Sequence, residues 1–164
     1  TLLAAGRLDT LATYLNGVAE VSGPEILQGH PSLLFYLGEL GRLRSRFQEA
    51  LGWYQQAEAA WRDRGQTEGV SRALRGQARV YLDTVDPSRA EALLEKSIRL
   101  SEGLEGTEMR ARLYELLAEN KLNAGQIAEA EALRKQADEL RHAGPTDSQP
   151  VSYTHLTLPT SDLV

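Results

Sequence analysis

The chain has 164 residues, of which 41% are hydrophobic and 25% charged, a composition typical of a soluble globular protein. A net charge of −5 provides no basic field for nucleic acid, and no apolar run reaches the roughly 18 residues that a membrane span requires. The absence of cysteine excludes a disulfide framework and a thiolate zinc site. We therefore expect a cytoplasmic protein that binds neither nucleic acid nor membrane directly.

The N-terminal part predicts half of a helical hairpin. Residues 1–6 are typical of a helix end stopped by Gly6, and residues 9–18 predict the next helix, with apolar side chains on one face. A linker follows at 21–30, in which Pro24 can start a short turn of helix. The chain begins with Thr1 and not with Met, so we expect a truncated N-terminus whose missing helix lies upstream.

Three further pairs of helices are predicted between residues 31 and 142. Their starts and ends are marked by proline at a first helical turn, by the N-cap Asp86, and by glycine just past a helix end. The predicted helices are 31–44 and 47–64, then 67–84 and 87–103, then 107–124 and 126–142. No stretch alternates at period two for long enough to form a strand, so we predict an all-α fold.

Equivalent positions of the three pairs lie 40 residues apart. Small residues recur where two helices must approach closely, as in the series Gly38, Ala78, Ala118 and the series Ala50, Ala90, Ala130. Large apolar residues lie between them. A fixed period of this content predicts stacked helical hairpins and not a single closed core.

These recurring positions resemble the tetratricopeptide repeat, which the first pair matches best at Leu34, Leu37, Gly38, Ala50, Tyr54 and Ala57. The 40-residue period exceeds the usual length of about 34 residues, which implies longer helices. Gly41, Gln77 and Arg134 depart from the pattern. Over residues 1–142 the resemblance implies a superhelix of antiparallel hairpins, with about three full repeats and a partial N-terminal one.

Longer repeats of this kind, with segments such as LLAAGRLDTLATYL and HPSLL, resemble the sensor arrays of MalT-like, ATP-dependent LuxR-type transcriptional regulators. In that family the array receives an inducer or a partner protein and relays the signal to a nucleotide-binding switch. The resemblance implies a non-enzymatic binding and signal-relay module. Two alternatives are a stand-alone tetratricopeptide scaffold for protein–protein interaction and an accessory array of a larger enzyme, and flanking sequence distinguishes all three.

The C-terminal residues have a different character. Residues 143–150 form a polar linker, and residues 151–164, VSYTHLTLPTSDLV, resemble the translation of a transposase-type sequencing adapter. The adapter frame agrees with the neighbouring codons on both sides. We therefore expect 151–164 to be a non-native tail and exclude it from the fold.

No pattern in the sequence indicates catalysis. The chain has no P-loop, no Gly-rich dinucleotide turn, no H-x-x-x-H pair and no Gly-x-Ser-x-Gly elbow. His30 and His142 are placed at helix ends, where we expect capping or solvated side chains, and His155 belongs to the tail. We predict no catalytic residue, no metal site and no cofactor.

The resemblance places a ligand groove on the concave face, lined by the first helix of each pair. It implies contacts for a protein or peptide partner, or a small inducer, at Ser32, Phe35, Glu39, Arg42, Arg72, Arg75, Arg79, Arg112, Glu115 and Glu119. The arginines at 72, 75 and 79 share one helix face and could bind a carboxylate or a phosphate. The alternative is that they form ion pairs with Glu39, Glu115 and Glu119 on neighbouring helices.

Two expectations concern apolar surface. Trp53 and Trp61 lie on the helix 47–64 near the face of Tyr54 and Ala57, and we expect both to pack in the core between hairpins. A truncated stack exposes an apolar end face, so we also expect weak self-association.

Overall fold

The computed structural model describes residues 10, 13, 17 and 29–143, and within 29–143 it contains six α-helices. They are α3 (Pro31–Leu43), α4 (Phe47–Asp63), α5 (Thr67–Asp83), α6 (Pro87–Ser101), α7 (Glu108–Asn123) and α8 (Ile127–His142). Every predicted boundary lies within two residues of the observed one. The all-α prediction is confirmed over this range.

Several predicted regions, among them the helix end 1–6 and most of the linker 21–30, lie largely or wholly outside the described residues. Of the predicted helix 9–18, only residues 10, 13 and 17 are described, and all three are helical. The polar linker beyond residue 143 and the tail 151–164 fall outside. None of the described helices is long and apolar enough to cross a membrane.

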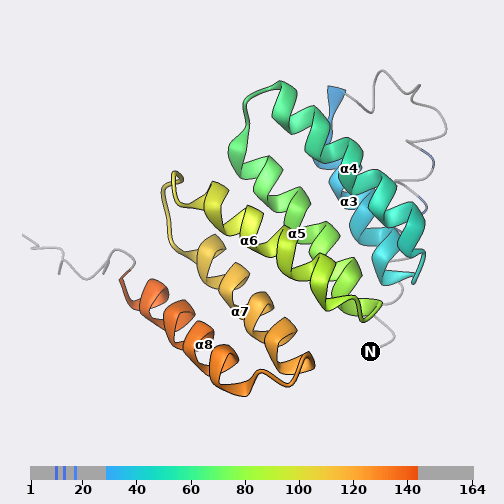
Figure 1. Cartoon of the computed structure of the whole chain (residues 1–164). Helices are drawn as coiled ribbons and strands as arrows, with labels where there is room; N and C mark the ends of the chain where they lie inside the picture. Colours follow the sequence, from blue (N-terminus) through green and yellow to red (C-terminus); the bar gives the residue numbers. More distant parts are fainter. Residues whose placement is uncertain (1–9, 11–12, 14–16, 18–28, 144–164) are drawn as a thin grey trace, which may run out of the picture.

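The helices form three antiparallel hairpins, α3–α4, α5–α6 and α7–α8, which stack in chain order (Figure 1). Each helix packs against its neighbours along the chain, and the first helices of adjacent hairpins also touch, α3 with α5 and α5 with α7. Among the described helices, the main contacts therefore run within each hairpin and between neighbouring hairpins, as in a solenoid. We call α3, α5 and α7 the A helices and the face that they share the A-helix face.

Small residues let the helices of each hairpin approach closely. The side chains of Ala50, Ala90 and Ala130, spaced by 40 residues, are all fully buried. Gly41, which departs from the repeat pattern, lies against α4, and a Cβ there would lie 3.2 Å from the Cβ of Ala50. The departure at Gly41 therefore has a packing reason.

Tyr54 occupies the centre of the first hydrophobic cluster and is fully buried. Its ring lies between two glycines, since a Cβ on Gly38 would lie 2.7 Å and one on Gly76 2.5 Å from the ring. Its hydroxyl donates a hydrogen bond of 2.7 Å to Oε1 of Glu39. This aromatic residue of α4 thus packs α3 and α5 against one another.

The expected core packing of the two tryptophans is confirmed. Trp61 is 5% exposed and Trp53 packs, partly buried, against the same cluster. The indole of Trp61 lies against the backbone of Gly69, where any Cβ would clash with the ring. Gly69 therefore allows α5 to approach α4 at this point.

The turns within the hairpins share one geometry. Ser45, Val85 and Gly125 follow the A helices at equivalent positions and have left-handed φ values of 58°, 56° and 77°. At the middle turn the amide N–H of Val85 donates to the carbonyl of Leu82 and that of Asp86 to Tyr81, at 3.2 and 2.8 Å. The same pair of bonds recurs in the other turns, so each A helix ends in a Schellman motif.

Candidate functional site

Two adjoining open pockets lie along the A-helix face. The larger, which we call the arginine pocket, has a volume of about 370 Å³ and is lined by Phe35, Tyr36, Arg72, Arg75, Glu108, Met109 and Arg112. The second, of about 310 Å³, is lined by Arg75, Arg79, Arg112, Glu115, Leu116 and Glu119. Arg75 and Arg112 belong to both pockets, so the two form one continuous surface.

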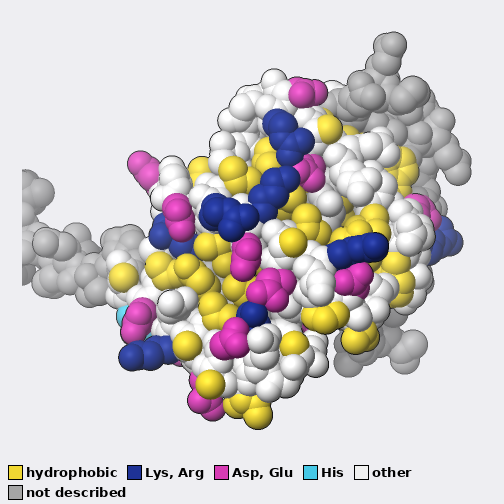
Figure 2. Space-filling model, viewed as in Figure 1, with side chains coloured by type: hydrophobic (Ala, Val, Ile, Leu, Met, Phe, Trp, Pro, Cys, Tyr) yellow, Lys and Arg dark blue, Asp and Glu magenta, His cyan; other side chains and the backbone are white. Residues whose placement is uncertain are grey.

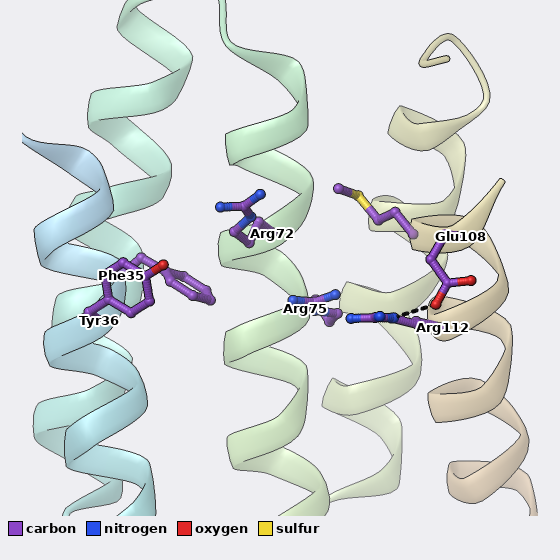
Figure 3. A pocket seen from close by; sticks show the side chains of 7 residues that line it. Phe35, Tyr36, Arg72, Arg75, Glu108 and Arg112 are labelled. Atoms are coloured by element: carbon purple, nitrogen blue, oxygen red, sulfur yellow. Dashed lines mark hydrogen bonds and ion pairs between the residues drawn. The ribbon is translucent and has the colours of Figure 1, made fainter. Parts of the chain in front are cut away.

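The three A helices each contribute a different wall to the arginine pocket (Figure 3). The two aromatic side chains come from α3, Arg72 and Arg75 from α5, and Glu108 and Arg112 from α7. Figure 3 shows Arg75 and Arg112 extending toward one another from facing helices. In Figure 2, dark blue Lys and Arg side chains form a line across the molecule beside yellow hydrophobic patches and magenta acidic groups.

Seven of the ten predicted groove residues line these two pockets. They are Phe35, Arg72, Arg75, Arg79, Arg112, Glu115 and Glu119. Ser32, expected at the same face, lines a third pocket of about 490 Å³ near the α4–α5 turn, which shares Arg72 with the arginine pocket. The structure thus gathers residues from three helices, 80 positions apart in the chain, on one surface. Whether they contact a ligand stays a prediction.

Glu39 and Arg42 line neither pocket, and their side chains instead contact residues of neighbouring helices. The Arg42 side chain is only 9% exposed, donates a 2.9 Å hydrogen bond to Oδ2 of Asp83, and lies 3.6 Å from Glu39. Glu39 also accepts the hydroxyl of Tyr54 and lies 3.6 Å from Arg79. These groups connect α3, α4 and α5, so they hold the A helices in place.

Two of the four arginines at this surface pair within their own helix. Arg72 binds Glu68 at 3.1 Å and Arg112 binds Glu108 at 2.8 Å, both at spacing i, i+4. Among the predicted pairs with Glu39, Glu115 and Glu119, the structure contains only Arg79–Glu39. Because the i, i+4 pairs are exposed, each stabilises the fold only weakly.

Arg75 differs from the rest of the row. Within the described part of the chain, its guanidinium forms no hydrogen bond and no ion pair. Burial lowers the pKa of Arg75, Glu39 opposes this effect, and repulsion from Arg79, Arg112 and Arg72 lowers the pKa further. An arginine stays charged in proteins, so Arg75 presents a positive charge with unused N–H donors to the pocket.

Two glutamates of α7 form ion pairs with an arginine of the last helix, α8. Arg141 of α8 binds Oε1 of Glu115 at 2.7 Å and lies 3.7 Å from Glu108. The hydrogen bond from Arg141 lowers the pKa of Glu115, with smaller contributions from burial, which raises it, and from the charge of Arg112. Arg141 therefore offsets negative charge that would otherwise reduce the attraction of the arginine row for an anion.

The sequence interpretation missed five residues at this surface: Tyr36, Glu108, Met109, Leu116 and Arg141. The first four lie three or four positions from predicted groove residues, so helical spacing alone could have placed them on the same face. Arg141 could not have been found in this way, because its partners lie on another helix.

The described residues contain no metal-binding cluster. No group of three or more His, Asp or Glu side chains within 29–143 is placed to hold a metal ion. His30 is exposed and precedes α3, while Nδ1 of the exposed His142 lies 2.7 Å from the carbonyl oxygen of Asp138. Both histidines have the solvated, helix-end positions that the sequence predicts. The A-helix face presents arginine N–H groups, which can donate to an anion, beside apolar side chains.

Comparison with known proteins agrees with this architecture. Residues 29–103 match the family model of the tetratricopeptide repeat. The fold is a tetratricopeptide-like superhelix of helical hairpins. No curated protein matches the sequence.

Two solved structures resemble the chain. BtubC (BKLC) from P. vanneervenii has a TM-score of 0.74 and 18% identity, with 97% of this chain and 64% of that chain covered. A putative kinesin light chain from Podosopora anserina with nearly identical TPR-like repeats has a TM-score of 0.68 and 22% identity, with coverage of 85% and 69%. At such identities the likeness shows the fold alone. The chain spans just under two thirds of the length of BtubC.

Proposed function

We propose that this chain is a non-enzymatic protein-binding scaffold whose A-helix face binds an acidic peptide segment of a partner protein. The observation that carries the proposal is Arg75, a partly buried cation without an ion-pair partner among the described residues, in the middle of a row of arginines. Tetratricopeptide-like arrays present extended surfaces of stacked helices, which suit an extended peptide.

The charge of the surface supports an acidic ligand. Three arginines and one glutamate line the arginine pocket, so its lining carries a net charge of +2, although the whole chain carries −5. Positive charge is thus concentrated on one face of an acidic protein. Such a face attracts acidic segments of a partner protein.

The first experiment measures binding of a fluorescein-labelled peptide of alternating Asp and Ala by fluorescence anisotropy. We expect measurable affinity that falls with added salt, and a loss of about tenfold in Arg75→Gln, because one charge-assisted contact contributes about 1.5 kcal/mol. Arg99→Gln is the matched control, since Arg99 is exposed on α6, away from both pockets, and pairs among the described residues with Glu95. Equal losses in both variants, or no binding of the acidic peptide, would refute the proposal.

The place of the scaffold in a longer protein is a separate proposal. The resemblance to MalT-like regulators supports an array that relays binding to a nucleotide-binding switch, but the family match and the two solved structures point no further than a tetratricopeptide scaffold. Sequencing the parent gene through both ends tests this. A nucleotide-binding domain upstream and a helix-turn-helix downstream would support the regulator, and a reading frame that continues through 151–164 in the parent gene would exclude an adapter origin of the tail.

A further inference from the structure

We propose that the arginine pocket takes the phosphotyrosine side chain of the partner, with the phosphate among Arg72, Arg75 and Arg112 and the ring against Tyr36 and Met109. This inference rests on the proposed function and adds that binding depends on phosphorylation of the partner. It follows from three features of the pocket: its charge, its unused donors and its apolar wall.

The charge matches a dianion better than a carboxylate. The lining carries a net +2 from three guanidiniums and the carboxylate of Glu108. A phosphate monoester carries between about −1.5 and −2 at neutral pH, so it nearly neutralises the pocket, whereas one carboxylate leaves about half of the charge unbalanced. Three acceptor oxygens on the phosphate also equal the number of arginines.

The arginines keep donors for such a group. Arg72 uses one terminal nitrogen for Glu68, and Arg112 uses Nε for Glu108, so each retains other N–H groups. Arg75 has its full planar set of donors, and guanidinium and phosphate geometries fit one another bidentately. The two existing ion pairs are exposed, so a phosphate replaces them at little cost.

The apolar groups of the pocket favour an aromatic ring over a short aliphatic stem as the part of the ligand that carries the phosphate. Tyr36 is 52% exposed, and its ring lies edge-on to the buried ring of Phe35, with centroids 5.7 Å apart at 70°. Met109 is held on the other side, where Sδ lies 3.4 Å from the hydroxyl of Ser71. Aromatic and thioether groups both favour contact with a further ring. The pocket therefore has apolar groups on its α3 and α7 walls and guanidinium groups between them, so a phosphorylated phenol can place its ring between the apolar walls and its phosphate among the arginines.

The test uses four labelled peptides that differ at one central residue in the same acidic background: phosphotyrosine, tyrosine, glutamate and phosphoserine. Fluorescence anisotropy measures each affinity for the full chain, with phenyl phosphate as a competitor. We expect the phosphotyrosine peptide to bind about 10- to 100-fold more tightly than the tyrosine peptide. We also expect it to bind at least about threefold more tightly than the phosphoserine peptide.

The outcomes separate this inference from the proposed function. Equal binding of all four peptides would overturn the phosphotyrosine site and leave the acidic-peptide scaffold intact. Binding of none would refute both. Tight binding of phenyl phosphate without a preference among the peptides would identify a small aryl phosphate as the ligand, and would also overturn the inference.

Two variants locate the contacts. Arg75→Gln should remove most of the preference for phosphotyrosine over tyrosine, while Arg99→Gln on α6 should leave the preference unchanged. Tyr36→Ala should lower the affinity for phosphotyrosine to near that for phosphoserine, without loss of helicity, because Tyr36 is half exposed. If the preference for phosphotyrosine persists in Arg75→Gln, the phosphate binds elsewhere and the assignment is wrong.

Discussion

Replacing Val85 by glycine should stabilise the protein, because valine has a left-handed backbone at this turn. Its φ is 56° and its side chain is 80% exposed, so the substitution removes little buried surface. A left-handed conformation costs an L-residue about 1–2 kcal/mol, and more for a β-branched one. Glycine in the unfolded chain has greater freedom, which offsets about 0.5–1 kcal/mol of the gain. We expect a net increase of about 1 kcal/mol in the free energy of unfolding.

The repeat provides the reciprocal experiment. Gly125 occupies the equivalent turn with φ of 77°, so by the same balance Gly125→Val should destabilise the protein by about 1 kcal/mol. Ser45→Gly is the intermediate case, because serine at φ 58° lacks the branched Cβ. Urea unfolding followed by circular dichroism measures all three, compared at constant m-value. If Val85→Gly and Gly125→Val both leave the midpoint unchanged, the turns do not have the left-handed geometry described above.

The remaining predictions concern packing and pH. Gly76→Ala should destabilise the protein by about 1–3 kcal/mol in urea unfolding, because the new Cβ would lie 2.5 Å from the ring of Tyr54; a neutral result would mean that the ring moves freely. Burial raises the pKa of Glu58, but its net pKa is lowered from 4.5 by hydrogen bonds from Gln77, Arg62 and Lys96. The stabilisation is therefore present above the unfolded-state pKa near 4.5 and is lost as pH falls through the lower folded-state value. Acid titration of Glu58→Gln should show a shallower loss of stability than the parent protein, and an identical pH dependence would contradict this assignment.

Local signals were sufficient to predict the helices. Pro31 and Pro87 mark helix starts, Gly65 and Gly125 mark ends, and the apolar period separates the helices between them. Each signal acts within about one turn of helix, so it needs no knowledge of the distant chain. The 40-residue period also placed the buried alanines Ala50, Ala90 and Ala130 correctly.

Local signals could not predict the side-chain and backbone positions that depend on contacts between helices. Glu39 and Arg42 have the right spacing for the groove, yet Tyr54 and Asp83 draw both side chains into contacts between helices. Val85 takes a left-handed turn because the Schellman hydrogen bonds and the packing of α5 on α6 require it, against its own preference. Such positions are set by tertiary contacts that overrule the local tendency.

The sequence by itself determined that this protein is a stack of helical hairpins and which face carries the arginines. Periodicity and caps act at short range, and the same pattern occurs three times. Only the tertiary structure decided which charges remain available to a ligand. Arg112 pairs with Glu108 while Glu115 turns to Arg141, and Arg75 is left between facing helices without a partner in the described residues. Ion pairing depends on distances of a few ångströms between helices, and those distances follow from how the hairpins pack.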